Sequence, residues 1–223
     1  SALGSGLSGF ALGVWVYERT GSATAFSVIV LAFMVPSVLF SPVAGALVDR
    51  WNRRLILIAC DAISAASTLT TLILLLSNSL EIWHLYILIF VSAIAGSFQW
   101  PAMSAATTML VPQEDLGRAG GMTQIGESIS TLLSPALAGY LFLSIGLNGI
   151  FVIDLLTFLV AVATLLVVSI PEPERTSVVE EETSPSLWKE IRYGWDYILA
   201  RRGLLLLLIY IATINLGFGF TDP

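Results

Sequence analysis

The chain has 223 residues, of which 56% are hydrophobic and 12% are charged, and its mean hydropathy is +0.87. This balance excludes an ordinary water-soluble domain and indicates a membrane protein. The formal net charge of −6 is local in origin, because five of the sixteen acidic residues fall between positions 172 and 182. The single cysteine, Cys60, excludes an internal disulfide and a cysteine metal cluster. With no phosphate-binding loop or basic patch either, we expect no cofactor, no metal and no nucleic-acid partner.

Long apolar runs give the predicted elements. A helix needs roughly 20 mainly apolar residues to cross a ~30 Å hydrocarbon layer. Six runs meet or approach this length, at 2–17, 23–48, 55–77, 82–110, 119–144 and 149–170. The sequence therefore predicts an all-α membrane protein with a six-helix bundle over residues 1–170. We expect the chain to start within its first membrane helix and to stop within a seventh, as a part of something longer.

Basic residues predict which side of each helix faces the cytoplasm, since short cytoplasmic loops retain Lys and Arg. When the loops are assigned to alternate sides of the membrane, one side holds only Arg19. The opposite side collects Arg50, Arg53, Arg54, Arg118, Arg175, Lys189, Arg192, Arg201 and Arg202. We therefore expect a multi-pass protein of the cell membrane, the inner or plasma membrane, with that basic side in the cytoplasm.

The segment after the sixth run is polar. Residues 171–186, PEPERTSVVEEETSPS, predict a flexible cytoplasmic linker because prolines and acids cannot build a packed core. Residues 187–202 place tryptophans and aliphatic side chains on one helical stripe, which predicts an amphipathic helix on the inner membrane surface. Residues 203–223 predict the start of the seventh membrane helix.

A short internal sequence similarity bears on the architecture. SPVAGAL at 41–47 in the second run resembles SPALAGYL at 134–141 in the fifth. A bundle built as a three-plus-three inverted repeat predicts this correspondence. Small residues and proline are common in membrane helices, so a chance match is the open alternative.

The stretch GALVDRWNRRLIL, residues 45–57, is the most specific motif. It resembles the loop between helices two and three of the major facilitator superfamily, whose pattern is Gly, x, Leu, Ala, Asp, Arg, x, Gly, Arg, Lys or Arg, x, x, Leu. Val48 and Asn52 depart from the pattern. The residues that match and that we expect to form a conformational-switch loop are Gly45, Asp49, Arg50, Arg53 and Arg54.

That resemblance implies a latch, in which Asp49 pairs with arginines of the next helix and releases them as two halves of a transporter rock. A cluster that only fixes topology is the alternative. Residues 4–25, 110–124 and the segment leading into LLLLLI resemble the drug and siderophore exporter branch, similar to macrolide efflux proteins. The likeness covers nearly all of the chain but about half of the usual twelve-helix transporter.

The fifth run resembles a small-residue motif of exporters in this superfamily. We expect close helix packing there, and ordinary small-residue packing without a link to export is the alternative. The matching positions are Gly121, Ser130, Ser134, Pro135, Ala138 and Gly139.

Carboxyl groups within the apolar runs are candidates for proton coupling, because ionisable groups are costly in hydrocarbon. Glu127 lies nine residues past Arg118, about 13 Å along the helix and near the membrane centre. Gln124 and Thr131 share its face and predict a polar wall of a substrate cavity. A structural, hydrogen-bonded acid is the alternative for Glu127.

Two further acids are weaker candidates for coupling. Asp61 would extend the network of Arg53 or Arg54, and Asp154 would lie near water at the outer interface. Gln99 and Trp100 in the fourth run are candidates for the cavity wall, with simple packing as the alternative.

An enzyme is not expected. Gly6-Leu7-Ser8-Gly9 fits the GxSG pattern of rhomboid proteases, but the only histidine, His84, starts the fourth run at the outer interface. A serine nucleophile needs a base within hydrogen-bond reach.

The sequence instead predicts an exporter of amphipathic small molecules that works by proton antiport and alternating access. Its expected partners are a small-molecule substrate, protons, the lipid bilayer and a C-terminal half of the same chain. The alternatives are an uptake symporter of the same superfamily and a non-transporting membrane protein that binds a partner.

Overall fold

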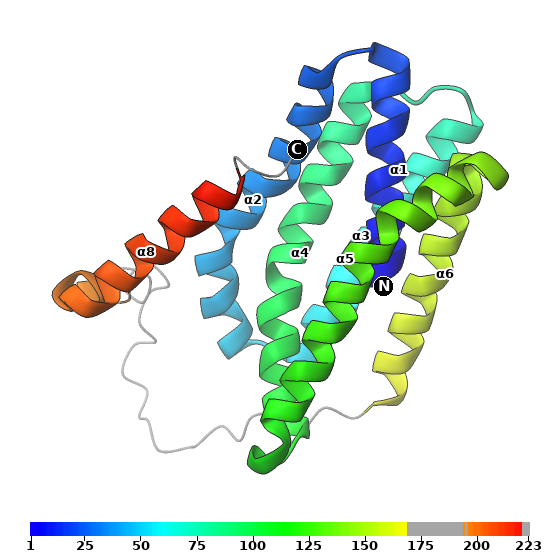
Figure 1. Cartoon of the computed structure of the whole chain (residues 1–223). Coiled ribbons are helices and arrows are strands. Elements are labelled where there is room, and N and C mark those ends of the chain that lie inside the picture. The colour runs from blue at the N-terminus through cyan, green and yellow to red at the C-terminus, as the bar shows by residue number, and fades with distance from the viewer. Residues whose placement is uncertain (169–193, 195, 220–223) are drawn as a thin grey trace. The chain divides into compact units, whose positions relative to one another are not determined.

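The computed structural model describes residues 1–168, 194 and 196–219 (Figure 1). The chain divides into two compact units, Ser1–Glu174 and Arg175–Pro223. The predicted linker at 171–186 and most of the predicted amphipathic helix at 187–202 lie outside the described residues. In the second unit, α8 spans Arg202–Gly219.

The described part of the chain is helical and contains no strand, so the predicted all-α class is confirmed. The helices of the first unit stand side by side in Figure 1. They are α1 (Ala2–Thr20), α2 (Ala23–Arg50), α3 (Arg53–Leu76), α4 (Ile82–Leu110), α5 (Leu116–Ser144) and α6 (Gly146–Val167), with a 3-10 turn η1 (Gln113–Asp115) before α5.

Local chemistry explains where the helices begin and end. The Ser22 hydroxyl accepts a hydrogen bond from the Ala25 N–H at 3.4 Å and caps α2. Asn52 caps α3 in the same way, since its Oδ1 accepts from the Leu55 N–H at 3.2 Å. Gly21 ends α1 at φ 60, a left-handed conformation that glycine adopts without a Cβ penalty.

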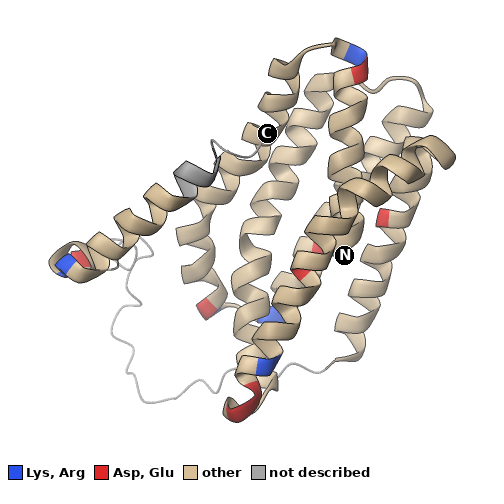
Figure 2. Ribbon diagram, viewed as in Figure 1, with Lys and Arg blue, Asp and Glu red and all other residues tan. Residues whose placement is uncertain are grey.

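Four of these helices are long and apolar enough to cross a membrane: α2, α3, α4 and α6. α1 and α5 match predicted runs but are more polar, with glycines and serines along α1 and Gln124 and Glu127 along α5. Charged residues gather near the helix ends, and most of the ribbon between them is uncharged (Figure 2). Six spans remain a prediction, while the helical bundle itself is observed.

Helix contacts follow the pattern expected of the repeat. α2 packs mainly on α4, and its equivalent α5 packs mainly on α1. In the same way, α4 packs on α3, and its equivalent α1 packs on α6. Exchanging helices one to three for four to six leaves this pattern unchanged. Because the members of each equivalent pair are three helices apart in chain order, they run in opposite directions when successive helices alternate.

The buried core has two parts. One surrounds α1 and includes Leu7, Ala11, Leu85, Ile150 and Phe151. The other joins the start of α3 to α2 and α4, and its members are Val48, Ile56, Leu57, Cys60, Ala95, Ala102 and Ala106. Alanines at this second contact let the helix backbones approach closely, as they do in membrane bundles.

Candidate functional site

The charged loop joins three helices through its arginines. Arg54 Nε donates to the Leu165 carbonyl oxygen at 2.7 Å, and its Nη2 donates to that of Leu166 at 2.6 Å. These carbonyls belong to the last turn of α6, where the helix dipole is negative and carbonyl groups lack partners within the helix. Arg54 therefore ties the start of α3 to the end of α6.

The other members of the predicted switch loop lie in different environments in this arrangement. Arg53 Nη1 lies 2.6 Å from the Met109 sulfur of α4, and its buried Nε has no hydrogen-bond partner among the described residues. Asp49 and Arg50 are exposed. Within the described chain, no ion pair links Asp49 to Arg53 or Arg54.

The glycine of the same loop is also loosely surrounded. A Cβ added at Gly45 would meet no atom within 4 Å. The Asp49 latch is not formed in this arrangement, and the switch role of the loop stays a prediction.

Asp61 forms a buried polar contact between α3 and α4. Its side chain is 3% exposed, and its Oδ1 accepts from Gln99 Nε2 at 2.9 Å and from the Ser1 hydroxyl at 3.4 Å. These partners replace the expected contact with the loop arginines. The structure thus joins a predicted coupling residue to a predicted cavity residue, whereas the neighbouring Trp100 is 67% exposed.

Asp154 is deeply buried, which corrects the expectation that it lies near interfacial water. It is 1% exposed because α6 packs on both α1 and α3. Thr68 Oγ1 of α3 donates to its Oδ2 at 3.1 Å. Its other oxygen, Oδ1, has no hydrogen-bond partner in the described part of the chain.

Glu127 occupies a very different environment. It lies halfway along α5 and is partly exposed, while Gln124 and Thr131 beside it are exposed. Its carboxylate makes no hydrogen bond or ion pair with another described residue. The three side chains therefore leave one side of α5 polar and unpacked, as an aqueous cavity wall requires.

The small-residue motif of α5 divides into packed and open positions. Ser134 and Ala138 are 3% and 0% exposed, and Ser134 Oγ donates to the Leu3 carbonyl oxygen of α1 at 3.4 Å. A Cβ at Gly6 would overlap Ser134 Oγ. Ser130 and Gly139 are half-buried, whereas Gly121 and Pro135 are exposed. Close packing of α5 on α1 thus depends on the middle of the motif.

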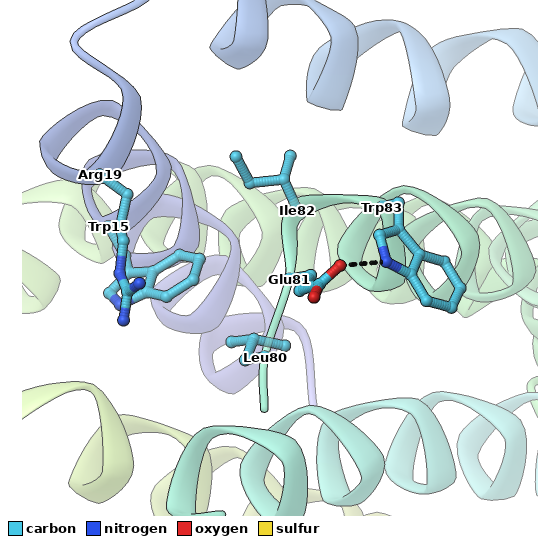
Figure 3. Close-up of a pocket in the computed structure, with 6 residues that line it drawn as sticks. All are labelled: Trp15, Arg19, Leu80, Glu81, Ile82 and Trp83. Atoms are coloured by element: carbon cyan, nitrogen blue, oxygen red, sulfur yellow. Dashed lines mark hydrogen bonds between the residues drawn. The ribbon is translucent and has the colours of Figure 1, made fainter. Parts of the chain in front are cut away.

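A cavity of about 450 Å³ opens where α1 ends and α4 begins (Figure 3). Arg19 lies over the Trp15 ring at 5.1 Å, and Trp83 Nε1 donates to Glu81 Oε2 at 2.6 Å. The remaining lining residues are Leu80 and Ile82. No residue predicted for the substrate cavity lines it.

Sequence reasoning missed the hydroxyl groups around Asp154. Ser8 drew attention only through the GxSG pattern, and Thr68 not at all. The available signal was spacing: Ser1, Ser5 and Ser8 repeat at helical intervals along α1, and Thr68 follows Asp61 by two turns of α3. Which helix each stripe faces depends on tertiary packing.

Comparison with known proteins places these features in a family context. The sequence model of the Major Facilitator Superfamily matches residues 1–222 of this chain. Macrolide efflux protein A of Streptococcus pyogenes is 33% identical over 210 residues, which cover 94% of this chain and 51% of that protein. Its namesake from Enterococcus faecalis is 35% identical over 190 residues, 85% of this chain and 57% of that protein.

A more distant relative has a broader name. The multidrug efflux pump Tap of Mycobacterium bovis is 25% identical over 209 residues, 90% of this chain and 50% of that protein. The chain spans about half the length of the curated relatives it matches.

Proposed function

The chain belongs to the major facilitator superfamily, and from this membership we propose that it is the N-terminal part of a secondary transporter that exports amphipathic small molecules of the drug or siderophore type. It is a multi-pass membrane protein with several apolar helices. The export direction is supported by the efflux function in the names of its relatives.

We propose that the remaining half of the protein supplies the second wall of the cavity. α2 and α5 support this division, because each packs mainly on one helix of the unit and leaves much of its surface exposed. The linker at 171–186 lies in the cytoplasm on this proposal, and the seventh helix at 203–223 starts the second half.

Glu127 carries the proposal of proton antiport. The observation behind it is the polar, unpacked side of α5, where a carboxylate with no hydrogen-bond partner among the described residues lies between Gln124 and Thr131. Such a group can exchange its proton when an aqueous cavity opens to one side of the membrane and then to the other. Proton binding and substrate binding at one cavity then compete, and their exchange drives alternating access.

The charged loop provides the switch on this proposal. In the described arrangement, Arg54 binds the end of α6 and Asp49 is exposed. An arrangement in which Asp49 reaches an arginine of α3 or a helix terminus of the other half would stabilise one of the two access states. Asp61 and Gln99 are then a structural pair or a secondary relay between α3 and α4.

The test is transport by the complete protein in inverted membrane vesicles with an imposed pH gradient. An amphipathic cationic dye should accumulate in wild-type vesicles. The Glu127→Gln variant keeps the size and polarity of the side chain but cannot release a proton, so accumulation should fall at least about tenfold, as for loss of a general acid-base group.

Glu114→Gln in the exposed turn η1 is the matched control and should transport as wild type at equal protein level. Unchanged accumulation in Glu127→Gln would remove Glu127 from coupling. Uptake of dye in the opposite direction would favour a symporter, and dye binding without movement would favour a membrane protein that binds a partner.

A further inference from the structure

In the middle of the described bundle, two buried oxygen atoms make no well-formed hydrogen bond with a described residue. They are Ser8 Oγ on α1 and Asp154 Oδ1 on α6. Ser8 is 6% exposed and Asp154 is 1% exposed. Buried polar atoms are normally paired, so each such exception needs a physical reason.

The two atoms belong to one cluster of polar side chains. The hydroxyl groups of Ser8 and Ser5 lie close to the Asp154 carboxylate, and Thr68 of α3 binds its second oxygen. A Cβ added at Gly4 would lie 2.7 Å from Asp154 Oδ1. The site thus gathers one carboxylate and three hydroxyl groups from three helices under a stretch of α1 that has no side chain at Gly4.

Among the described residues, no basic side chain balances the charge of this carboxylate. From α1 it is faced by hydroxyl groups and by the amino group of Ser1, which is charged only where the chain begins at that residue. Asp61, the nearest acid on α3, precedes Thr68 by seven residues, about 10 Å along the helix. An uncompensated carboxylate at this depth would cost several kcal/mol. Either a bound proton or a bound metal cation removes that cost.

We propose that Ser8, Thr68 and Asp154 together bind one monovalent metal cation of the size of Na⁺. Hard cations prefer carboxylate and hydroxyl oxygens. A single carboxylate balances one positive charge, and the described residues hold no group of three His, Cys, Asp or Glu side chains that would suit a divalent or transition metal. The ion would cross-link α1, α3 and α6.

This inference does not depend on the direction of transport or on Glu127. The cation site lies inside the packed helices, whereas Glu127 lies on the unpacked side of α5. Protons compete with the metal cation for Asp154 Oδ1, so the apparent Na⁺ affinity should fall as the pH is lowered.

The experiment uses the complete protein, purified in detergent and dialysed into N-methyl-D-glucamine chloride. Thermal unfolding is followed as Na⁺ replaces the organic cation at constant ionic strength, and ²²Na⁺ binding is measured in parallel. We expect Tm to rise with Na⁺ concentration and to saturate, since a ligand that binds only the folded state stabilises it.

Two variants test the ligand set. Asp154→Asn should abolish ²²Na⁺ binding and the Na⁺-dependent rise in Tm. Ser8→Ala removes one neutral ligand and should weaken the apparent affinity roughly tenfold. Glu127→Gln is the matched control, because it changes an acid of the same bundle outside the site, and it should keep the full response.

The result that overturns the proposal is a wild-type Tm that is the same in Na⁺ and N-methyl-D-glucamine from pH 6 to pH 9, with no ²²Na⁺ bound. A Na⁺ response that persists in both Asp154→Asn and Ser8→Ala also overturns it. If Asp154→Asn fails to fold, the Ser8→Ala affinity and wild-type ²²Na⁺ binding still decide the question.

Discussion

Three carboxylates near the middle of the bundle differ in the partners that packing gives them. Asp61 is bound by an amide, Asp154 by a threonine hydroxyl, and Glu127 by no described side chain. All three were candidates for coupling because the sequence shows only that an acid occurs in an apolar run. Their environments separate them: Glu127 is open for exchange, whereas Asp61 and Asp154 are enclosed by neighbouring helices.

Gly4 offers the sharpest prediction for a single residue. A Cβ there would overlap Thr157 Oγ1 and lie 3.1 Å from the Asp154 Cα, which is backbone and cannot easily move. Gly4→Ala should therefore lower the free energy of unfolding by about 1–3 kcal/mol, the usual cost of overpacking. The measurement is thermal unfolding of the purified protein.

Gly9→Ala is the control on the same helix, since a Cβ at Gly9 meets no atom within 4 Å. Alanine favours a helix over glycine by about 1 kcal/mol. Gly9→Ala should leave Tm unchanged or raise it. Equal Tm values for the two variants would show that α1 does not approach α6 as described.

At the scale of helices, hydrophobic length predicted the elements and capping chemistry set their ends. The run at 82–110 coincides with α4. In contrast, α2 ends at Arg50, after its apolar run, and α3 begins at Arg53, before its apolar run. Charged residues continue a helix readily, so composition alone places the boundary too early, and Asn52 between them is the actual cap. The faces that meet were not predictable, because Ser8 joins Asp154 only when α1 packs on α6.

The link between Arg54 and the last turn of α6 is testable at this scale. Arg54→Ala removes two hydrogen bonds from the carbonyl groups of Leu165 and Leu166. We expect the amides of the final turn of α6 to exchange with deuterium about tenfold faster, since a charged cap at a helix C-terminus contributes about 1 kcal/mol. Hydrogen exchange with mass spectrometry measures this directly.

Arg118→Ala is the comparison variant. Its guanidinium makes a 3.5 Å ion pair with Asp115 and is largely exposed, and such surface pairs contribute little. Its effect on α6 should be undetectable. Faster exchange along the whole of α6 in Arg54→Ala would instead indicate global destabilisation, and no change would show that the carbonyl contacts carry no stability.

At the scale of the whole molecule, family membership and the repeated contact pattern agree on the architecture. The motif at 45–57 was specific enough to predict the family from the sequence, and the match to residues 1–222 confirms it. The substrate cavity could not be derived in the same way, because we propose that its second wall belongs to the other half of the transporter. The pocket at Trp15 and Trp83 arises where the end of α1 lies beside the turn before α4, and it has no sequence motif.

Topology gives the prediction for the molecule as a whole. Basic loops predict that the α3–α4 turn faces outward and that the turn before α5 faces the cytoplasm. In a Cys60→Ser background, a membrane-impermeant maleimide should label Ser79→Cys in intact cells. It should label Gln113→Cys only after the cells are permeabilised; both positions are exposed in the structure. The reverse pattern would invert the assigned orientation.

The uneven packing of α5 has a consequence for molecular evolution. Ser134 and Ala138 fix the helix against α1, while most of its other side chains are exposed outside the core of the bundle. If α5 lines the proposed substrate cavity, mutations at the outward positions alter which compounds are accepted at little cost in folding, whereas mutations at the two anchoring positions are removed by selection for stability. Lineages exposed to different toxic compounds should therefore diverge fastest along the outward side of α5 and remain alike along its contact with α1.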